Sequence, residues 1–126
     1  MLIDFNNEKP IYIQIAEEIE DAIFTGAFLE ETQIPSTTEI SIKYKINPAT
    51  VLKGMNLLVN NGIVYKKRGI GVFVSPGAMD KIKKNRQKQF SKNYIRSVIE
   101  EAIKLELSKD QLIKLIERGF DEYGEN

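Results

Sequence analysis

Three consecutive bases, Lys66, Lys67 and Arg68, stand directly before a turn that contains Gly69 and Gly71. Ammonium and guanidinium groups bind phosphate oxygens, and the planar guanidinium also suits a narrow minor groove of DNA. Glycine permits the tight turn and leaves room for a phosphodiester backbone to approach. The stretch therefore predicts a phosphate-contacting tip. The alternative interpretation is a charged hairpin whose side chains are only solvated.

The segments that flank this tip have strand composition. Residues 63–65 and 72–74 are β-branched or aromatic, which predicts a two-stranded hairpin. Pro76 and Gly77 then end the hairpin and mark a domain boundary.

Two short helices precede the hairpin. Ser36 and Glu39 have the spacing of a capping box, which predicts a helix over about residues 37–44 and a turn at 45–46. Asn47 caps a second helix and Pro48 occupies its first position. The apolar stripe of this second helix, which must face the core, consists of Val51, Met55, Leu58 and Val59. Helix–turn–helix plus hairpin is a winged helix, which most often places its second helix in a DNA major groove.

The residue types at both helix starts suit that role. Free backbone N–H groups and hydroxyls at a helix N-terminus bind phosphate, although plain capping explains the same residues. At the second helix, asparagine pairs with adenine, small methyl groups contact thymine, and lysine reaches guanine or phosphate. The predicted DNA-binding residues are Ser36, Thr37, Thr38, Asn47, Ala49, Thr50, Lys53, Lys66, Lys67, Arg68, Gly69 and Gly71.

The formal net charge is zero, but the charges are segregated. Residues 36–75 carry six bases against Glu39 alone, whereas residues 1–35 carry one base and eight acids. A zero sum therefore hides one basic face. Residues 81–96 add seven bases and no acid, which indicates either a solvated helix face or an accessory DNA contact.

The composition argues against several other functions. The 126 residues include no histidine and no cysteine, so soft or imidazole metal ligands and thiol chemistry are missing. Neither a catalytic constellation nor a phosphate-binding glycine loop accompanies the acids. The chain also lacks an apolar run of about 20 residues and a signal-peptide start. We therefore expect a cytoplasmic protein that is not an enzyme, with no metal, no cofactor and no membrane partner.

Helical periodicity covers both ends of the chain. Ile11, Ile15, Ile19 and Ile23 predict a helix of about four turns that starts with Pro10 in its first turn. After residue 77, apolar positions again recur at helical spacing. Within that region the polar stretch 83–89 predicts a protrusion or kink, and Ser108 with Gln111 is a second capping box.

The expected fold is mainly α (α+β), with a winged helix–turn–helix domain at residues 1–75 and a two-helix dimerisation tail at residues 76–126. The apolar faces of the tail are too broad for two helices to cover, so we expect them to meet a second copy across a two-fold axis. Packing on the chain's own winged helix is the alternative. The residues predicted to dimerise are Ile95, Val98, Ile99, Ala102, Ile103, Leu112, Ile116 and Phe120.

The chain resembles the winged-helix domain of GntR-family bacterial transcription regulators, and its short tail resembles the YtrA-like subfamily. The residues that carry this resemblance are Pro10 to Ile15, Gly26, Ile34 to Ser36, Asn47 to Val51, Leu57, Gly62, Ile63 and Lys67 to Val74. Many relatives carry basic residues at the positions of Thr38 and Leu52. The resemblance implies a repressor that binds a pseudo-palindromic operator in double-stranded DNA as a homodimer.

Two other functions remain open on the sequence. One is a winged-helix module that binds proteins and not DNA. The other is a regulator that senses a small-molecule effector, of unknown identity, at a site between the tail and the DNA-binding domain.

Overall fold

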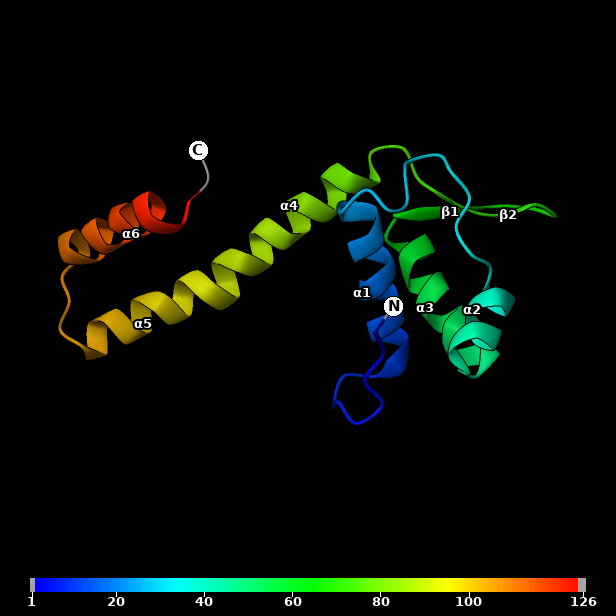
Figure 1. Ribbon diagram of the computed structural model, residues 1–126, viewed down its shortest axis with the longest axis horizontal. Coiled ribbons are helices and arrows are strands. Elements are labelled where there is room, and N and C mark those ends of the chain that lie inside the picture. The colour runs from blue at the N-terminus through cyan, green and yellow to red at the C-terminus, as the bar shows by residue number, and fades with distance from the viewer. Residues whose placement is uncertain (1, 125–126) are drawn as a thin grey trace. The chain divides into compact units, whose positions relative to one another are not determined.

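The computed structural model describes residues 2–124 (Figure 1). Met1 and residues 125–126, which belong to the two predicted domains, lie outside the described residues. The elements in chain order are α1 (Ile11–Phe24), α2 (Thr37–Tyr44), α3 (Pro48–Asn60), β1 (Val64–Lys67), β2 (Gly71–Val74), α4 (Ala78–Phe90), the π-helical turn η1 (Ser91–Ile95), α5 (Arg96–Lys104) and α6 (Lys109–Tyr123). The chain divides into two compact units, and the division falls within α4, after Asn85. A winged helix followed by helices, as predicted, is confirmed.

The first unit has a continuous apolar core. Helices α1 and α2 both pack on α3, so α3 is the central element of the unit. The predicted stripe of α3 is confirmed, since Val51, Met55 and Leu58 are fully buried, while Val59 is only half-buried. The other buried apolar residues of this core are Ile15, Ala16, Ile19, Ile23, Ile34, Ile40, Ile46, Ile63, Val64, Val74, Ala78 and Ile82.

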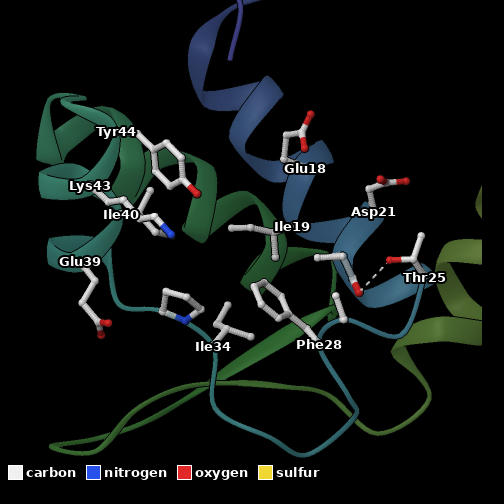
Figure 2. A pocket seen from close by; sticks show the side chains of 13 residues that line it. Glu18, Ile19, Asp21, Thr25, Phe28, Ile34, Glu39, Ile40, Lys43 and Tyr44 are labelled. Carbon is white, nitrogen blue, oxygen red and sulfur yellow. Dashed lines mark hydrogen bonds between the residues drawn. The ribbon is translucent and has the colours of Figure 1, made fainter. Parts of the chain in front are cut away.

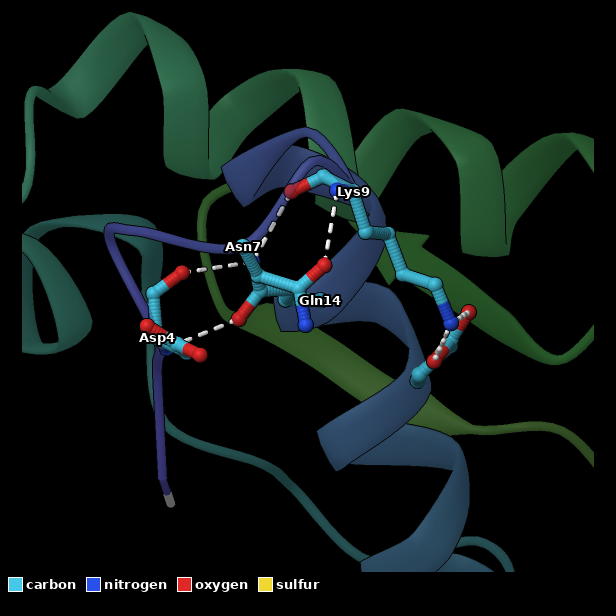
Figure 3. Close-up of polar contacts among 5 residues, drawn as sticks. Asp4, Asn7, Lys9 and Gln14 are labelled. Carbon is cyan, nitrogen blue, oxygen red and sulfur yellow. Dashed lines mark hydrogen bonds and ion pairs between the residues drawn. The ribbon is translucent and has the colours of Figure 1, made fainter.

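The lead-in to α1 is tied down by one buried amide (Figure 3). The Gln14 side chain accepts a hydrogen bond from the Asp4 N–H at 2.8 Å and donates to the carbonyls of Asp4 and Lys9 at 2.9 Å. Pro10 is the N-cap and not a first-turn residue, which corrects the sequence prediction. Its backbone is extended (ψ 145°), yet its carbonyl already accepts the N–H groups of Ile13 and Gln14.

The helix–turn–helix forms as its capping residues predict. Ser36 and Glu39 exchange both hydrogen bonds of a capping box, and the side chain of Asn47 accepts the N–H of Ala49 at 2.8 Å. Between the helices, Lys45 adopts the left-handed conformation (φ 54°). The buried hydroxyl of Ser41 donates to the Ile46 carbonyl at 2.6 Å, which locks the turn.

The hairpin is supported from an unexpected segment. Strands β1 and β2 are antiparallel and pair Val64 with Val74 at one end and Lys67 with Gly71 at the other. Residues 31–34 run along the free side of β2: Glu31 N–H donates to Val74 O at 2.8 Å, and Ile34 N–H donates to Val72 O at 2.9 Å. The predicted two-stranded wing is thus confirmed and is braced by the loop that follows α1.

The loop that follows α1 also caps the start of helix α4. The carboxylate of Glu30 accepts the N–H groups of Gly77 at 2.7 Å and Met79 at 3.3 Å, which caps the helix from a position far away in sequence. Ala78 and Ile82 of α4 are buried in the core of the first unit. The polar stretch 83–89 is regular α-helix, and the departure from α geometry occurs in η1 instead.

The second unit contains η1, α5 and α6. The chain turns between the helices at Glu106 (φ 58°), and Leu107 N–H donates to Ala102 O at 2.9 Å. The second capping box is confirmed, because Ser108 and Gln111 exchange both of its hydrogen bonds at the start of α6. Between Leu2 and Gly124, no helix has both the length and the apolar character needed to cross a membrane.

Candidate nucleic-acid interface

The first turn of α2 is prepared for an external acceptor. The capping box occupies the N–H groups of Ser36 and Glu39, which bond to each other's side chains at 3.2 Å and 3.0 Å. Within the described residues, the N–H groups of Thr37 and Thr38 have no such partner. The side chain of Thr38 is exposed and that of Thr37 is half-buried. Ser36 therefore acts as the cap, and the two threonines offer the groups that a phosphate would accept.

The start of α3 presents a small, neutral surface. Asn47, Ala49 and Lys53 are exposed, and Thr50 is half-buried. The side-chain oxygen of Asn47 accepts one hydrogen bond as the cap, and its NH₂ group and the second lone pair of the oxygen remain for other partners. Leu52 is 43% exposed on the same helix and offers only apolar contact.

Lys53 does not extend freely from this surface. Its ammonium lies 4.2 Å from the centre of the Tyr12 ring on α1, which is the geometry of a cation–π contact. This contact holds the Lys53 ammonium against α1. Tyr12 was missed by the sequence reasoning, because nothing in the spacing of two residues so far apart indicates that they touch.

The three bases of the wing differ in the groups that they contact. Lys66 donates to the Asn56 side chain of α3 at 3.0 Å, and the Lys67 ammonium lies 4.3 Å from the centre of the Phe73 ring. Arg68 is exposed, and within residues 2–124 its guanidinium has no internal partner. Arg68 is therefore the base most available to a ligand, while Lys66 connects the wing to α3.

Both predicted glycines of the wing adopt positive φ. Gly69 has φ +76° with open space around it, whereas Gly71 has φ +151° and faces the side chain of Gln33. A Cβ at position 71 would collide with the Gln33 amide nitrogen, which also donates to the Ile70 carbonyl at 3.1 Å. Gln33, like Asn56, was missed. Asn56 is half-buried on α3 at helical spacing from Lys53, so its place was predictable, but that of Gln33 was not.

The unit collects most of its positive charge at these elements. Residues 36–75 contain six bases, and their single acid, Glu39, has its carboxylate engaged with the backbone at the start of α2. An anionic partner would therefore meet a net positive surface on α2, α3 and the wing. No group of three acids within residues 2–124 is placed to hold a metal ion.

The tail exposes most of the apolar side chains predicted to dimerise. Ile103 is 69% and Phe120 is 66% exposed, whereas Ala102 is only 6% exposed, so its methyl group is already covered. Leu112 is half-buried. The remaining members of the predicted set, all exposed, are Ile95, Val98, Ile99 and Ile116. Further exposed apolar side chains that the prediction omitted are Tyr94, Leu105, Ile113, Leu115 and Tyr123.

Comparison with known proteins adds a family to this geometry. The family model described as bacterial regulatory proteins, gntR family, matches residues 11–74. The chain is 30% identical to the uncharacterized HTH-type transcriptional regulator YhcF of Bacillus subtilis, over 95% of this chain and 97% of that protein. It is 32% identical to the HTH-type transcriptional repressor YtrA of the same organism, over 60% of this chain and 58% of YtrA.

A solved structure provides a DNA-bound counterpart of the first unit. The DNA-binding domain of AraR, in complex with the operator ORX1, superimposes with a TM-score of 0.55 and 29% identity, over 60% of this chain and 96% of that domain. The predicted resemblance, both to the family and to YtrA, is confirmed by these matches.

Proposed function

Because the chain belongs to the GntR family of bacterial regulatory proteins, whose members are DNA-binding transcription regulators, we propose that it represses transcription as a homodimer on a pseudo-palindromic operator. The observation that carries the proposal is that one compact unit contains the N-termini of α2 and α3 together with a basic wing. Repression is supported by the similarity to YtrA, which is a repressor.

We assign the major groove to the start of α3. There Asn47 would donate its NH₂ group to a base acceptor, and the methyl groups of Ala49 and Thr50 would contact thymine. The Asn47 oxygen already accepts the Ala49 N–H, so one of its two acceptor positions is occupied by capping.

We assign the phosphate contacts to two sites on either side of α3. At the start of α2, the N–H groups of Thr37 and Thr38 would bind one phosphate without any formal charge, and Lys53 would add positive charge nearby. At the wing, Arg68 and Lys67 would bind a second phosphate, or the narrow minor groove, while Gly69 and Gly71 allow the close approach. The hydrogen bond from Lys66 to Asn56 would hold the wing against α3.

We assign dimerisation to the tail. Exposed isoleucine, valine and phenylalanine side chains on α5 and α6 form a surface that a monomer would leave in water. A two-fold partner that presents the same surface would cover it and would place two α3 helices on one operator. Half-sites about 34–36 Å apart, or a multiple of that spacing, follow from the DNA helical repeat.

The remaining assignments rest on the same family membership. We propose a regulatory and non-enzymatic role in the cytoplasm, without a cofactor, and with double-stranded DNA and a second copy of the chain as partners. A module that binds only proteins is not supported, because it would have no reason to concentrate bases on α2, α3 and the wing.

Selection of bound sequences from random duplex DNA tests this proposal. The expected product is an inverted repeat, and the Thr50→Ala protein should select altered bases at the position that its methyl group contacts, with little change in overall affinity. An enriched motif without two-fold symmetry would overturn the dimeric operator, and no enrichment at all would overturn sequence-specific binding.

A further inference from the structure

The tip of the wing presents an isoleucine where a turn favours a polar residue. Strand β1 ends at Lys67 and β2 begins at Gly71, and the hairpin runs out beyond the helices of the first unit (Figure 1). Ile70, the last residue of the turn between the strands, is 64% exposed. A single exposed apolar side chain is ordinary on a protein surface. Tight turns, however, are built mostly from glycine, proline and small polar residues, so Ile70 departs from local turn chemistry and calls for a functional explanation.

The backbone polar groups of Ile70 both have partners inside the first unit. The Ile70 N–H donates to the Lys67 carbonyl at 3.0 Å, which closes the turn. The Ile70 carbonyl accepts the side-chain amide of Gln33 at 3.1 Å. Gly69, which precedes Ile70, has open space around it and no side chain to shield its neighbour. The part of Ile70 that is chiefly offered to an external molecule is therefore its aliphatic side chain.

The segment that holds this turn is itself anchored in the core. Gln33 belongs to the loop that pairs with the free side of β2, and the next residue, Ile34, is only 3% exposed. The Ile34 side chain points into the space between α1 and α2 that it shares with Ile19 (Figure 2). A Cβ at Gly71 would collide with the Gln33 amide, so the glycine is what lets that amide reach the Ile70 carbonyl. The turn is thus braced, which restricts where the Ile70 side chain can lie.

The chemistry of the tip matches the minor groove of DNA. Lys66, Lys67 and Arg68 place three positive charges beside Ile70, which favours the negative potential of the groove. Every base pair presents acceptors on the groove floor, and a G·C pair adds the 2-amino group of guanine. An aliphatic side chain over that amino group would displace its water and would offer no acceptor in return. The acceptors are common to both kinds of pair, so the amino group decides the difference between them.

We propose that Ile70 is a specificity-determining residue, which enters the minor groove beside each half-site and selects A·T over G·C pairs there. The inference rests on the proposed function, because it requires the wing to lie on operator DNA. In this assignment Arg68 contributes affinity for every sequence, and Ile70 contributes a base preference without any hydrogen bond to a base. The preference lies outside the base pairs that α3 contacts in the major groove.

Titration of the complete protein into four variants of the selected operator tests the proposal. One base pair in each flank is made A·T, G·C, inosine·C or 2,6-diaminopurine·T, and the substitution is moved along both flanks symmetrically. Inosine lacks the 2-amino group of guanine and diaminopurine adds one to adenine, while the major-groove pattern of each purine is unchanged. At the position that Ile70 contacts, the A·T and inosine·C duplexes should bind at least about fivefold more tightly than the other two.

Three variants make the assignment specific to one side chain. Ile70→Thr keeps the β-branched shape and adds a hydroxyl that can accept a hydrogen bond from the amino group, so the four affinities should become equal. Ile70→Val is the matched control, since it remains aliphatic and should keep the preference. Arg68→Ala should weaken binding to all four duplexes by a similar factor and leave their ratios unchanged.

Two results would overturn the role of Ile70 and leave the proposed repressor intact. The first is a parent protein that binds the G·C and inosine·C duplexes equally at every flanking position. The second is a preference that survives in the Ile70→Thr protein, because it would then come from the width or stiffness of the DNA. A parent protein that binds none of the four duplexes more tightly than random DNA would overturn the proposed function and this inference together.

Discussion

The two compact units bury their apolar side chains to very different extents. In the first unit Ile15, Met55 and Leu58 are 0% exposed, and one chain closes the whole core. In the second unit α6 has no buried residue over Lys109–Tyr123, and Phe120 is 66% exposed. The first unit therefore closes its core within one chain, whereas the apolar surface of the second is the surface that we propose a second copy covers.

The polar contacts of the two units differ in the same way. In the first unit, side chains join distant segments: Gln14 holds the lead-in, Glu30 caps α4, and Gln33 braces the wing. In the second unit, the Arg96–Glu100 ion pair and the Ser97–Asn93 hydrogen bond lie within one helical turn. Local contacts of this kind stabilise a helix but not its packing against another element.

The largest expected effect concerns the closed core. Met55→Ala removes a fully buried side chain from α3, so the free energy of unfolding should fall by about 2–5 kcal/mol. Leu52→Ala, on the exposed face of the same helix, is the control and should change stability by about 0.5 kcal/mol or less. Urea denaturation measures both. An equal loss for the two variants would show that α3 does not form the core described.

The next largest effect concerns the exposed apolar surface on α5 and α6. Ile99→Asp places a charge on the surface that we propose to dimerise, so association should weaken by more than about tenfold, equivalent to about 1.4 kcal/mol. The fold of the first unit should not change, because Ile99 lies outside it. Sedimentation at several concentrations measures the association.

Lys114→Ala provides the matched control for the tail, since Lys114 is exposed on α6 and charged. It should associate as the parent does. A parent protein that is monomeric at micromolar concentration would contradict the proposal that the exposed apolar side chains of the tail dimerise.

A smaller effect is expected from the capping boxes, since each unit contains one. Ser36 and Ser108 each form a capping box, and each change to alanine should cost about 1 kcal/mol of helix stability. Ser36→Ala should also weaken DNA binding, because α2 presents the Thr37 and Thr38 N–H groups, whereas Ser108→Ala should not. Titration of each variant into the same labelled operator measures the difference, and equal losses would remove α2 from the interface.

Local patterns explain which parts of the fold were predictable. The bounds of α2, the Asn47 cap and the two capping boxes follow from residues within one helical turn, and the structure confirms them. Alternating β-branched and aromatic residues with glycines likewise identified the hairpin. Each of these features is stabilised by residues close to it in the sequence, so the sequence alone is sufficient to predict it.

The features that were missed join segments far apart in the chain. Glu30 caps α4 across 47 residues, and Gln33 reaches Ile70 across 37, so neither contact leaves a local pattern. The cation–π contact of Lys53 with Tyr12 has the same character. The kink or protrusion was expected in the polar stretch 83–89, which is regular α-helix, and the π-helical turn η1 that follows it was not predicted, since polarity shows exposure and does not show a change of hydrogen-bond register.

The salt dependence of DNA binding by the Arg68→Ala protein tests whether the wing contacts DNA, with Glu117→Gln on the exposed face of α6 as control. Affinity for the selected operator would be measured over a range of salt concentrations. We expect a uniform loss of affinity across sequences, and a log–log salt slope smaller by about 1 for each protomer that loses a phosphate contact. An unchanged affinity and slope would contradict the assignment of the wing to DNA.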